Sequence, residues 1–303
     1  MQYSSESLAG QTVLVTGASG FIGEHLCARL HSTGAEVHGI SRSEQPDSNI
    51  LRWWQGDGAN LADMQRILTA VKPDVIFHLA SYASGDRSLE AVMPTLHGTL
   101  ISTVNLLTLV AQMGCRRLVL IGSLEEPELG NPIASSPYAA AKWSSSVYAQ
   151  MFHRLYQVPV VVTRPFMVYG PAQNVSKLIP YVIRSLLQGE APKLSSGQRQ
   201  VDWIYVSDLI DGLIAVTQTV GIEGETFEFG SSTLTPISTT VHYLNQLIDP
   251  SIKPLFGALS DRPMEQVRIA DITSASVRLG WHPQTSLEDG LAQTVAWYAA
   301  HTN

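Results

Sequence analysis

Hydrophobic residues in the first half of the chain follow two alternating patterns. Short runs rich in Val, Ile and Leu lie at residues 12–15, 36–40, 74–80, 117–123 and 158–163. Continuous apolar runs of this kind are typical of parallel strands that are covered on both faces. Between the runs, apolar residues recur at helical spacing, as at Phe21, Ile22, Leu26 and Leu30. The pattern predicts an α/β fold built on a doubly wound parallel sheet.

The pattern loosens after about residue 171 into shorter elements separated by Gly and Pro. A last helix is predicted near 287–300, with Ser286 as its cap and an apolar face that includes Leu291 and Tyr298. We therefore expect a larger sheet domain over 1–171 and a smaller mixed α/β region over 172–303. The chain is free to cross between the two.

Composition narrows the classes of protein to consider. The chain has 303 residues, of which 45% are hydrophobic and 15% charged, so it has enough apolar side chains for a large core. A net charge of −7 and the lack of a Lys and Arg cluster argue against a nucleic-acid partner. No apolar run approaches roughly 18 residues, and residues 1–9 lack the features of a signal peptide, which argues against a membrane.

The cysteines and histidines give no sign of a disulfide framework or a metal site. Cys27 and Cys115 form no CxxC pair, and the histidines show neither HxH nor HExxH spacing. His78 lies within an apolar run and is interpreted as a packed residue rather than a ligand. We expect no metal and a reducing, cytoplasmic location.

A glycine-rich turn follows the first apolar run directly. In Thr-Gly-Ala-Ser-Gly-Phe-Ile-Gly at 16–23, Gly17 has the freedom in φ that a tight turn needs. Gly20 leaves room for a pyrophosphate, and Gly23 allows close packing of helix on strand. The freed N–H groups and the helix N-terminus then face the phosphates. The turn predicts a dinucleotide site, with further cofactor contacts from Ser19, Phe21 and Ile22.

The end of the second strand bears on which dinucleotide is bound. An acidic residue there would bind the ribose 2′-hydroxyl of NAD, but the sequence reads Ile-Ser-Arg-Ser at 40–43. Arg42 could pair with a 2′-phosphate, so NADP is slightly favoured over NAD; the alternative is a solvated loop arginine. Asp57, after the third strand, either accepts the adenine amino group or stabilises a turn.

A tyrosine and a lysine share one face of a predicted helix. Ser136 and Pro137 give a cap and a first helical residue, and Tyr138 and Lys142 follow four residues apart. A phenol of pKa about 10 needs about 3 units of help to exchange protons at about pH 7, or roughly 4 kcal/mol. An ammonium about 4 Å away supplies energy on that order at an effective dielectric constant of about 20. The pair predicts acid–base catalysis.

These motifs together resemble the extended branch of the short-chain dehydrogenase/reductase superfamily, which contains nucleotide-sugar epimerases and dehydratases. The similarity extends to residues 73–80, 164–171, 202–208 and 279–291. It implies a Rossmann-type cofactor domain, with Ser123 as a third catalytic residue that orients the substrate oxygen and Lys142 also holding the nicotinamide ribose. It further implies cofactor contacts from Leu79, Ala80 and Pro165.

The net reaction depends on the residues after Ser123. The resemblance implies a catalytic role for Glu125, since dehydratases and decarboxylases of the branch commonly carry a glutamate there. Leu124 replaces the aspartate of glucose-type 4,6-dehydratases, whereas the Ser-Leu-Glu-Glu run at 123–126 resembles some keto-sugar reductases. A solvated loop carboxylate is the alternative for Glu125 and the favoured interpretation of Glu126.

On the substrate side the chain departs from the branch. Met167 replaces an asparagine and Val201 an arginine, and Arg199 and Arg262 are candidates to compensate. The expected substrate contacts are Ser81, Ser123, Glu125, Met167, Arg199 and Arg262. The apolar helical patterns at 89–113 and 137–156 resemble the pair that forms a homodimer interface in the superfamily.

The sequence thus predicts an NAD(P)-dependent nucleotide-sugar epimerase or dehydratase that works by hydride transfer, at C4 by the resemblance, through a keto intermediate. The first alternative is an NADPH-dependent reductase of a 4-keto sugar or another small ketone. A non-catalytic dinucleotide sensor is an alternative of another class.

Overall fold

The computed structural model describes residues 8–127, 133–261 and 264–301. The chain forms two compact units, each considered by itself. The first comprises Met1–Pro165, Ile210–Glu228 and Thr273–Trp281, and the second comprises Phe166–Leu209, Phe229–Ile272 and His282–Asn303. The chain therefore passes between the units five times. The expected division at residue 171 left such crossing open.

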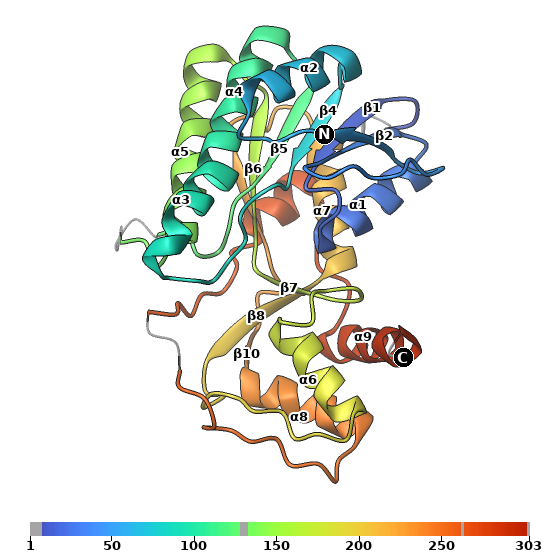
Figure 1. Ribbon diagram of the computed structural model, residues 1–303, viewed down its shortest axis with the longest axis vertical. Helices are drawn as coiled ribbons and strands as arrows, with labels where there is room; N and C mark the ends of the chain where they lie inside the picture. Colours follow the sequence, from blue (N-terminus) through green and yellow to red (C-terminus); the bar gives the residue numbers. More distant parts are fainter. Residues whose placement is uncertain (1–7, 128–132, 262–263, 302–303) are drawn as a thin grey trace. The chain divides into compact units, whose positions relative to one another are not determined.

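A seven-stranded sheet forms the centre of the first unit (Figure 1), in the order β3-β2-β1-β4-β5-β6-β9. The five pairs from β3 to β6 are parallel. The strand order reverses between β1 and β4, which is the point where ligands bind in doubly wound sheets. The predicted fold class is confirmed. The strands are β1 (Thr12–Thr16), β2 (Glu36–Ser41), β3 (Arg52–Gln55), β4 (Val75–His78), β5 (Arg117–Ile121), β6 (Val160–Pro165) and β9 (Thr226–Phe229).

Helices cover both faces of this sheet. On one face, α2 (Leu61–Val71), α4 (Ser102–Met113) and α5 (Pro137–Tyr156) pack on alternate strand residues to form a core that includes Leu14, Ile76 and Leu118. On the other lie α1 (Phe21–Ser32) and α7 (Val206–Gln218), and an Arg29–Asp211 ion pair of 2.6 Å joins them. Burial on both faces explains why strands such as β1, β4, β5 and β6 are rich in apolar residues.

The predicted helical pattern at 89–113 is one continuous helical stretch of 25 residues. It comprises η1 (Leu89–Ala91), α3 (Val92–Thr95), η2 (Leu96–Ile101) and α4. With a mean hydropathy of 1.2, it could span a membrane by length and composition alone. Leu106 and Val110 belong to the buried core, however, and Asn105 donates to the carbonyls of Gly58 and Ala59. The stretch therefore packs as a core helix of the first unit.

The second unit has a three-stranded sheet in the order β10-β8-β7, with helices α6, α8 and α9. Its core includes Tyr169, Trp203, Leu244 and Leu291. As predicted, α9 follows Ser286, whose hydroxyl oxygen accepts the N–H of Asp289 at 3.1 Å. The elements are β7 (Met167–Tyr169), α6 (Leu178–Leu187), β8 (Gln200–Tyr205), β10 (Leu234–Pro236), α8 (Ile237–Ile248) and α9 (Leu287–His301); η3 (Ala275–Leu279) belongs to the first unit.

Candidate active site

The glycine turn lies between β1 and α1, at the point where the strand order reverses. Gly17 has a φ of +72°, and a Cβ on it would lie 2.8 Å from the backbone nitrogen of Ala80, after β4. A Cβ on Gly23 would lie 2.2 Å from the carbonyl oxygen of Gly17. Side chains at either position would therefore move the backbone. The turn is as tight as the sequence predicts.

The N-terminus of α1 is suited to an anionic group. Its N-cap residue, Gly20, supplies no side-chain cap, so no side chain of the helix takes up the first-turn N–H groups. Ser19 and Gly20 are exposed, and Phe21 and Ile22 are half-buried. A bare, exposed helix start beside a glycine turn fits the pyrophosphate of a dinucleotide, because its partial positive charge and free donors match that group.

A chain of hydrogen bonds holds the strand ends beneath this turn. The Thr103 hydroxyl donates to the Thr99 carbonyl (2.7 Å) and therefore accepts from His78 Nε2 (3.1 Å). Nδ1 of His78 then accepts from the Thr16 hydroxyl (2.8 Å), whose oxygen accepts the Ala80 N–H (3.1 Å). Burial is the main cause that lowers the pKa of His78 to about 3, so the ring is neutral. His78 is a packed residue, as interpreted from the sequence.

Tyr138 and Lys142 lie on α5, which begins as predicted. The Ser136 hydroxyl oxygen accepts the N–H of Ala139 at 3.0 Å. Lys142 is buried, and its Nζ donates to the carbonyl of Ile121 at 2.8 Å and lies 5.8 Å from the centre of the Tyr138 ring. The strand β5 thus fixes the ammonium beside the tyrosine.

The sequence predicts that the Lys142 ammonium lowers the pKa of Tyr138, but in the structure the pKa of Tyr138 is raised. Burial is the main cause that raises the pKa of Tyr138; a hydrogen bond with Ser123 lowers it, and the charges of Glu125 and Glu126 raise it further. Burial likewise lowers the pKa of Lys142 to about 8, against the charge of Glu126. Burial is therefore the largest effect on both pKa values, and it disfavours both the phenolate and the ammonium.

Ser123 and Glu125 complete the cluster in the loop after β5. Ser123 is buried, and its Oγ accepts the backbone N–H of Glu125 at 3.1 Å. The Ser136 hydroxyl donates to Glu125 Oε2 at 3.4 Å, which ties the loop to the start of α5. The structure thus brings together the four predicted catalytic residues, Ser123, Glu125, Tyr138 and Lys142.

Glu126 is not the solvated loop carboxylate favoured from the sequence. Its side chain is fully buried and pairs with Arg164 at the end of β6, at 2.9 Å from Nη2 and 3.0 Å from Nε. Local sequence offers no signal for this pairing. A weak signal exists at the level of topology, because β5 and β6 are adjacent parallel strands whose ends meet at one edge.

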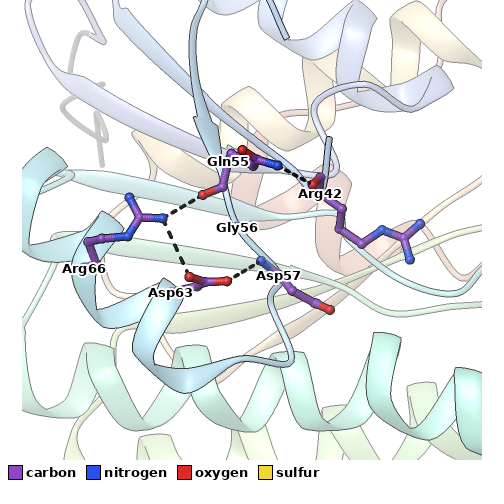
Figure 2. A pocket seen from close by; sticks show the side chains of 6 residues that line it. All are labelled: Arg42, Gln55, Gly56, Asp57, Asp63 and Arg66. Atoms are coloured by element: carbon purple, nitrogen blue, oxygen red, sulfur yellow. Dashed lines mark hydrogen bonds and ion pairs between the residues drawn. The ribbon is translucent and has the colours of Figure 1, made fainter. Parts of the chain in front are cut away.

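A small open pocket lies at the carboxyl ends of β2 and β3 (Figure 2). Arg42, Gln55, Gly56, Asp57, Asp63 and Arg66 line it. Arg66 donates to the Gln55 carbonyl at 2.7 Å and pairs with Asp63 at 3.7 Å. Asp57 also stabilises a turn, since its Oδ1 accepts the N–H of Ala59 at 3.0 Å. In Figure 2 the side chains of Arg42 and Asp57 extend away from Arg66.

The remaining predicted residues fall in two places. In the first unit, Leu79, Ala80 and Ser81 follow β4 directly, and Pro165 ends β6. In the second unit, Met167 begins β7, and Arg199 pairs with Glu265 at 3.1 Å. Arg262 lies outside the described residues. Within residues 8–127, 133–261 and 264–301, no group of three or more His, Cys, Asp or Glu side chains could hold a metal ion.

The glycine turn and the Ser-Tyr-Lys cluster at the carboxyl edge of one parallel sheet define a dinucleotide-dependent enzyme of the Rossmann type. Residues 13–230 match the NAD dependent epimerase/dehydratase family, and the chain belongs to this family.

Similar proteins extend over nearly the whole chain. A dTDP-glucose 4,6-dehydratase from Shigella flexneri is 29% identical, covering 96% of this chain and 93% of that protein. The structure of UDP-glucose 4-epimerase from Thermotoga maritima with UDP-glucose has a TM-score of 0.88 at 25% identity and covers 96% and 99% of the two chains. That of UDP-glucuronic acid 4-epimerase from Bacillus cereus, with UDP-glucuronic acid and NAD, has a TM-score of 0.86 at 26% identity and covers 95% and 99%. The prediction of an NAD-dependent enzyme of the epimerase/dehydratase type is confirmed.

Proposed function

We propose that this enzyme acts on a nucleotide-activated sugar and transfers hydride at C4 of the sugar through a keto intermediate. The observation that carries the proposal is the cluster of Ser123, Tyr138 and Lys142 at the sheet edge that also holds the glycine turn. The similar proteins described above are named for nucleotide sugars. Bound NAD or NADP supplies the hydride acceptor and donor in this chemistry.

The residues of the chain then have distinct tasks. Tyr138, as the phenolate, takes the proton of the sugar hydroxyl as hydride leaves, and as the phenol it returns this proton in the reverse step. Ser123 already accepts a hydrogen bond from the Glu125 N–H, so its hydroxyl proton is available to Tyr138 or to the sugar oxygen. The buried Lys142 ammonium stabilises the phenolate form of Tyr138, which is the form that accepts the proton.

Epimerase chemistry is favoured over dehydration. The resemblance assigns an aspartate acid of glucose-type 4,6-dehydratases to the position of Leu124, which here is a buried apolar side chain. Without that acid, the leaving hydroxyl has no proton donor at this position, whereas epimerisation needs only hydride return to the other face. The second candidate is an NADPH-dependent keto-sugar reductase, which the arginines of the pocket at β2 and β3 favour.

The test is incubation of the purified protein with UDP-glucose, UDP-glucuronic acid or dTDP-glucose, each with NAD or NADP. Chromatography and mass spectrometry distinguish an isomer of equal mass, a product that has lost water and a reduced sugar. An epimerase retains its cofactor and consumes none, whereas a reductase consumes added NADPH with a 4-keto sugar. Conversion of none of these sugars, with no change in nicotinamide absorbance, would contradict the proposal.

We also propose that NADP is accommodated at least as well as NAD. No carboxylate follows β2 directly, and the Arg42 side chain extends from the strand end in the pocket of Figure 2. Replacing Arg42 with Ala is expected to weaken NADP binding about tenfold or more and NAD binding much less, because only NADP loses a charge-assisted contact. Fluorescence titration of both cofactors measures this.

The matched control for Arg42 is Arg52 on β3, which is exposed and pairs with Glu36 at 3.3 Å outside the pocket. Arg52→Ala should leave both affinities unchanged. A clear preference of the wild-type protein for NAD would overturn the assignment of Arg42.

We propose that two copies associate through the helices at 89–101 and α5. These helices pack on each other and expose apolar side chains, among them Leu89 (82%), Met93 (54%) and Val147 (50%). Val147→Glu is expected to convert a dimer to a monomer, because the interface would bury an unpaired charge. Sedimentation measures the mass, and a monomeric wild-type protein would contradict the proposal.

We place the enzyme in the cytoplasm, in keeping with its two free cysteines, of which Cys27 is buried and Cys115 half-buried. A nucleic acid, a membrane and a metal are not part of the proposed activity. Met167, Arg199 and Arg262 stay predictions for the substrate side.

A further inference from the structure

The side chain of Glu126 accepts a hydrogen bond from the backbone of the catalytic loop. Glu126 Oε1 accepts the backbone N–H of Ser123 at 2.9 Å, while Oε2 is held by Arg164. The carboxylate is fully buried, so no water competes for either contact. Its two oxygens thus connect Ser123 to the end of the neighbouring strand β6.

A glycine next to the Glu126–Arg164 ion pair leaves space for the Glu126 carboxylate. The register pairs Ile121 with Thr163, so Gly122 lies beside Arg164 as the strands end. The N–H of Gly122 donates to the Thr163 carbonyl at 2.7 Å, and a Cβ on Gly122 would lie 2.3 Å from Glu126 Oε1. Any side chain at Gly122 would displace the carboxylate, so the glycine is needed for the pair to form.

We propose that Glu126 is a positioning residue for the reaction: together with Arg164 it fixes the backbone of Ser123 and places a buried negative charge near Tyr138 and Lys142. This inference rests on the proposed function only in taking Ser123, Tyr138 and Lys142 as the reacting cluster. The two adjacent glutamates then differ in their contacts: the Glu126 carboxylate pairs with Arg164, whereas the Glu125 carboxylate accepts a hydrogen bond from Ser136.

The charge of Glu126 acts on both partners of the catalytic pair. Burial is the main cause that raises the pKa of Tyr138, and the charges of Glu125 and then Glu126 raise it further. Burial lowers the pKa of Lys142, and the charge of Glu126 opposes that effect. Removing the charge therefore favours both the phenolate and the neutral amine. The other groups that face this cluster are Arg164 on β6, which neutralises Glu126, and His78 on β4, which stays neutral and whose pKa is lowered by the Lys142 charge.

Two substitutions at Glu126 separate the effect of side-chain length from the effect of charge. Glu126→Gln keeps an oxygen that accepts the Ser123 N–H but removes the charge. Glu126→Asp keeps the charge but is one methylene too short to hold Ser123 and Arg164 together. Thermal unfolding of both variants confirms that each is folded before it is compared.

The first measurement needs no substrate. Nuclear magnetic resonance of isotope-labelled lysine, with Lys142 assigned by its loss in Lys142→Met, follows the titration of this ammonium. Burial lowers the pKa of Lys142 to about 8 in the wild-type chain, and the titration is expected there. Glu126→Gln is expected to lower the pKa further, by on the order of one unit, whereas Glu126→Asp leaves it nearly unchanged. An unmoved titration in folded Glu126→Gln would overturn the electrostatic part of the inference.

The second measurement uses the nucleotide sugar that is converted in the assay above. For Glu126→Asp, kcat is expected to fall by about 100-fold with little change in KM, because Ser123 is misplaced in the transition state. For Glu126→Gln, the pH profile of kcat shifts to lower pH, since Tyr138 and Lys142 both lose their protons at lower pH. Wild-type kcat in folded Glu126→Asp would overturn the positioning role.

A surface ion pair provides the control. Asp211→Asn breaks the exposed contact with Arg29 and should change neither the Lys142 titration nor kcat. If no sugar is converted, the proposed function fails, while the titration still decides whether Glu126 sets the charge at Lys142.

Discussion

Replacing Tyr138 with Phe is expected to lower kcat by about 1,000-fold while cofactor affinity stays within a few-fold. The substitution removes only the hydroxyl that accepts the sugar proton and the hydrogen bond with Ser123. The ring stays in place, because α5 is fixed by the Ser136 cap and by the contact of Lys142 with the Ile121 carbonyl. Steady-state kinetics and cofactor titration measure the two quantities separately.

Tyr156, the last residue of the same helix, is the matched control. It is exposed and packs edge-on against Phe152, a contact that Tyr156→Phe preserves. This variant should keep wild-type kcat. Full activity of Tyr138→Phe on the true substrate would show that another group moves the proton.

Replacing Gly23 with Ala is the second large change, with an expected loss of cofactor affinity of about 100-fold. The new Cβ would lie 2.2 Å from the Gly17 carbonyl oxygen and 2.8 Å from the Cα of Ala18, both backbone atoms that cannot rotate away. The helix α1 must then move off β1, which costs about 1–3 kcal/mol and displaces the N–H groups that face the phosphates. Fluorescence titration of NAD and NADP measures the loss.

Gly114 is the control for the conformational cost of a glycine replacement. It ends α4 with a φ of +78°, and a Cβ there would meet nothing within 4 Å. Gly114→Ala should lower stability by about 1–3 kcal/mol, because a φ of +78° with a ψ of 160° is a conformation that essentially only glycine adopts, and leave cofactor affinity unchanged. Wild-type affinity in folded Gly23→Ala would mean that the turn does not hold the dinucleotide.

The sequence alone determined the parts of this protein that depend on short-range patterns. The apolar runs predicted strands β1, β2, β4, β5 and β6, because parallel strands buried on both faces are rich in apolar residues without regular polar alternation. The glycine turn, the Ser136 cap and the spacing of Tyr138 and Lys142 are equally local, since helix and turn geometry fix them within a few residues. The role of Ser123 was predicted from the family resemblance, which implies a catalytic Ser or Thr at the end of the strand before the tyrosine helix.

What only the tertiary structure decided depends on groups distant along the chain. The buried pairing of Glu126 with Arg164 and the hydrogen-bonded chain through Thr16, His78 and Thr103 form only when neighbouring strands end side by side. The raised pKa of Tyr138 is also a tertiary property, because desolvation depends on everything packed around the phenol. Spacing along a helix shows which residues can meet, but burial decides what charge they carry when they do.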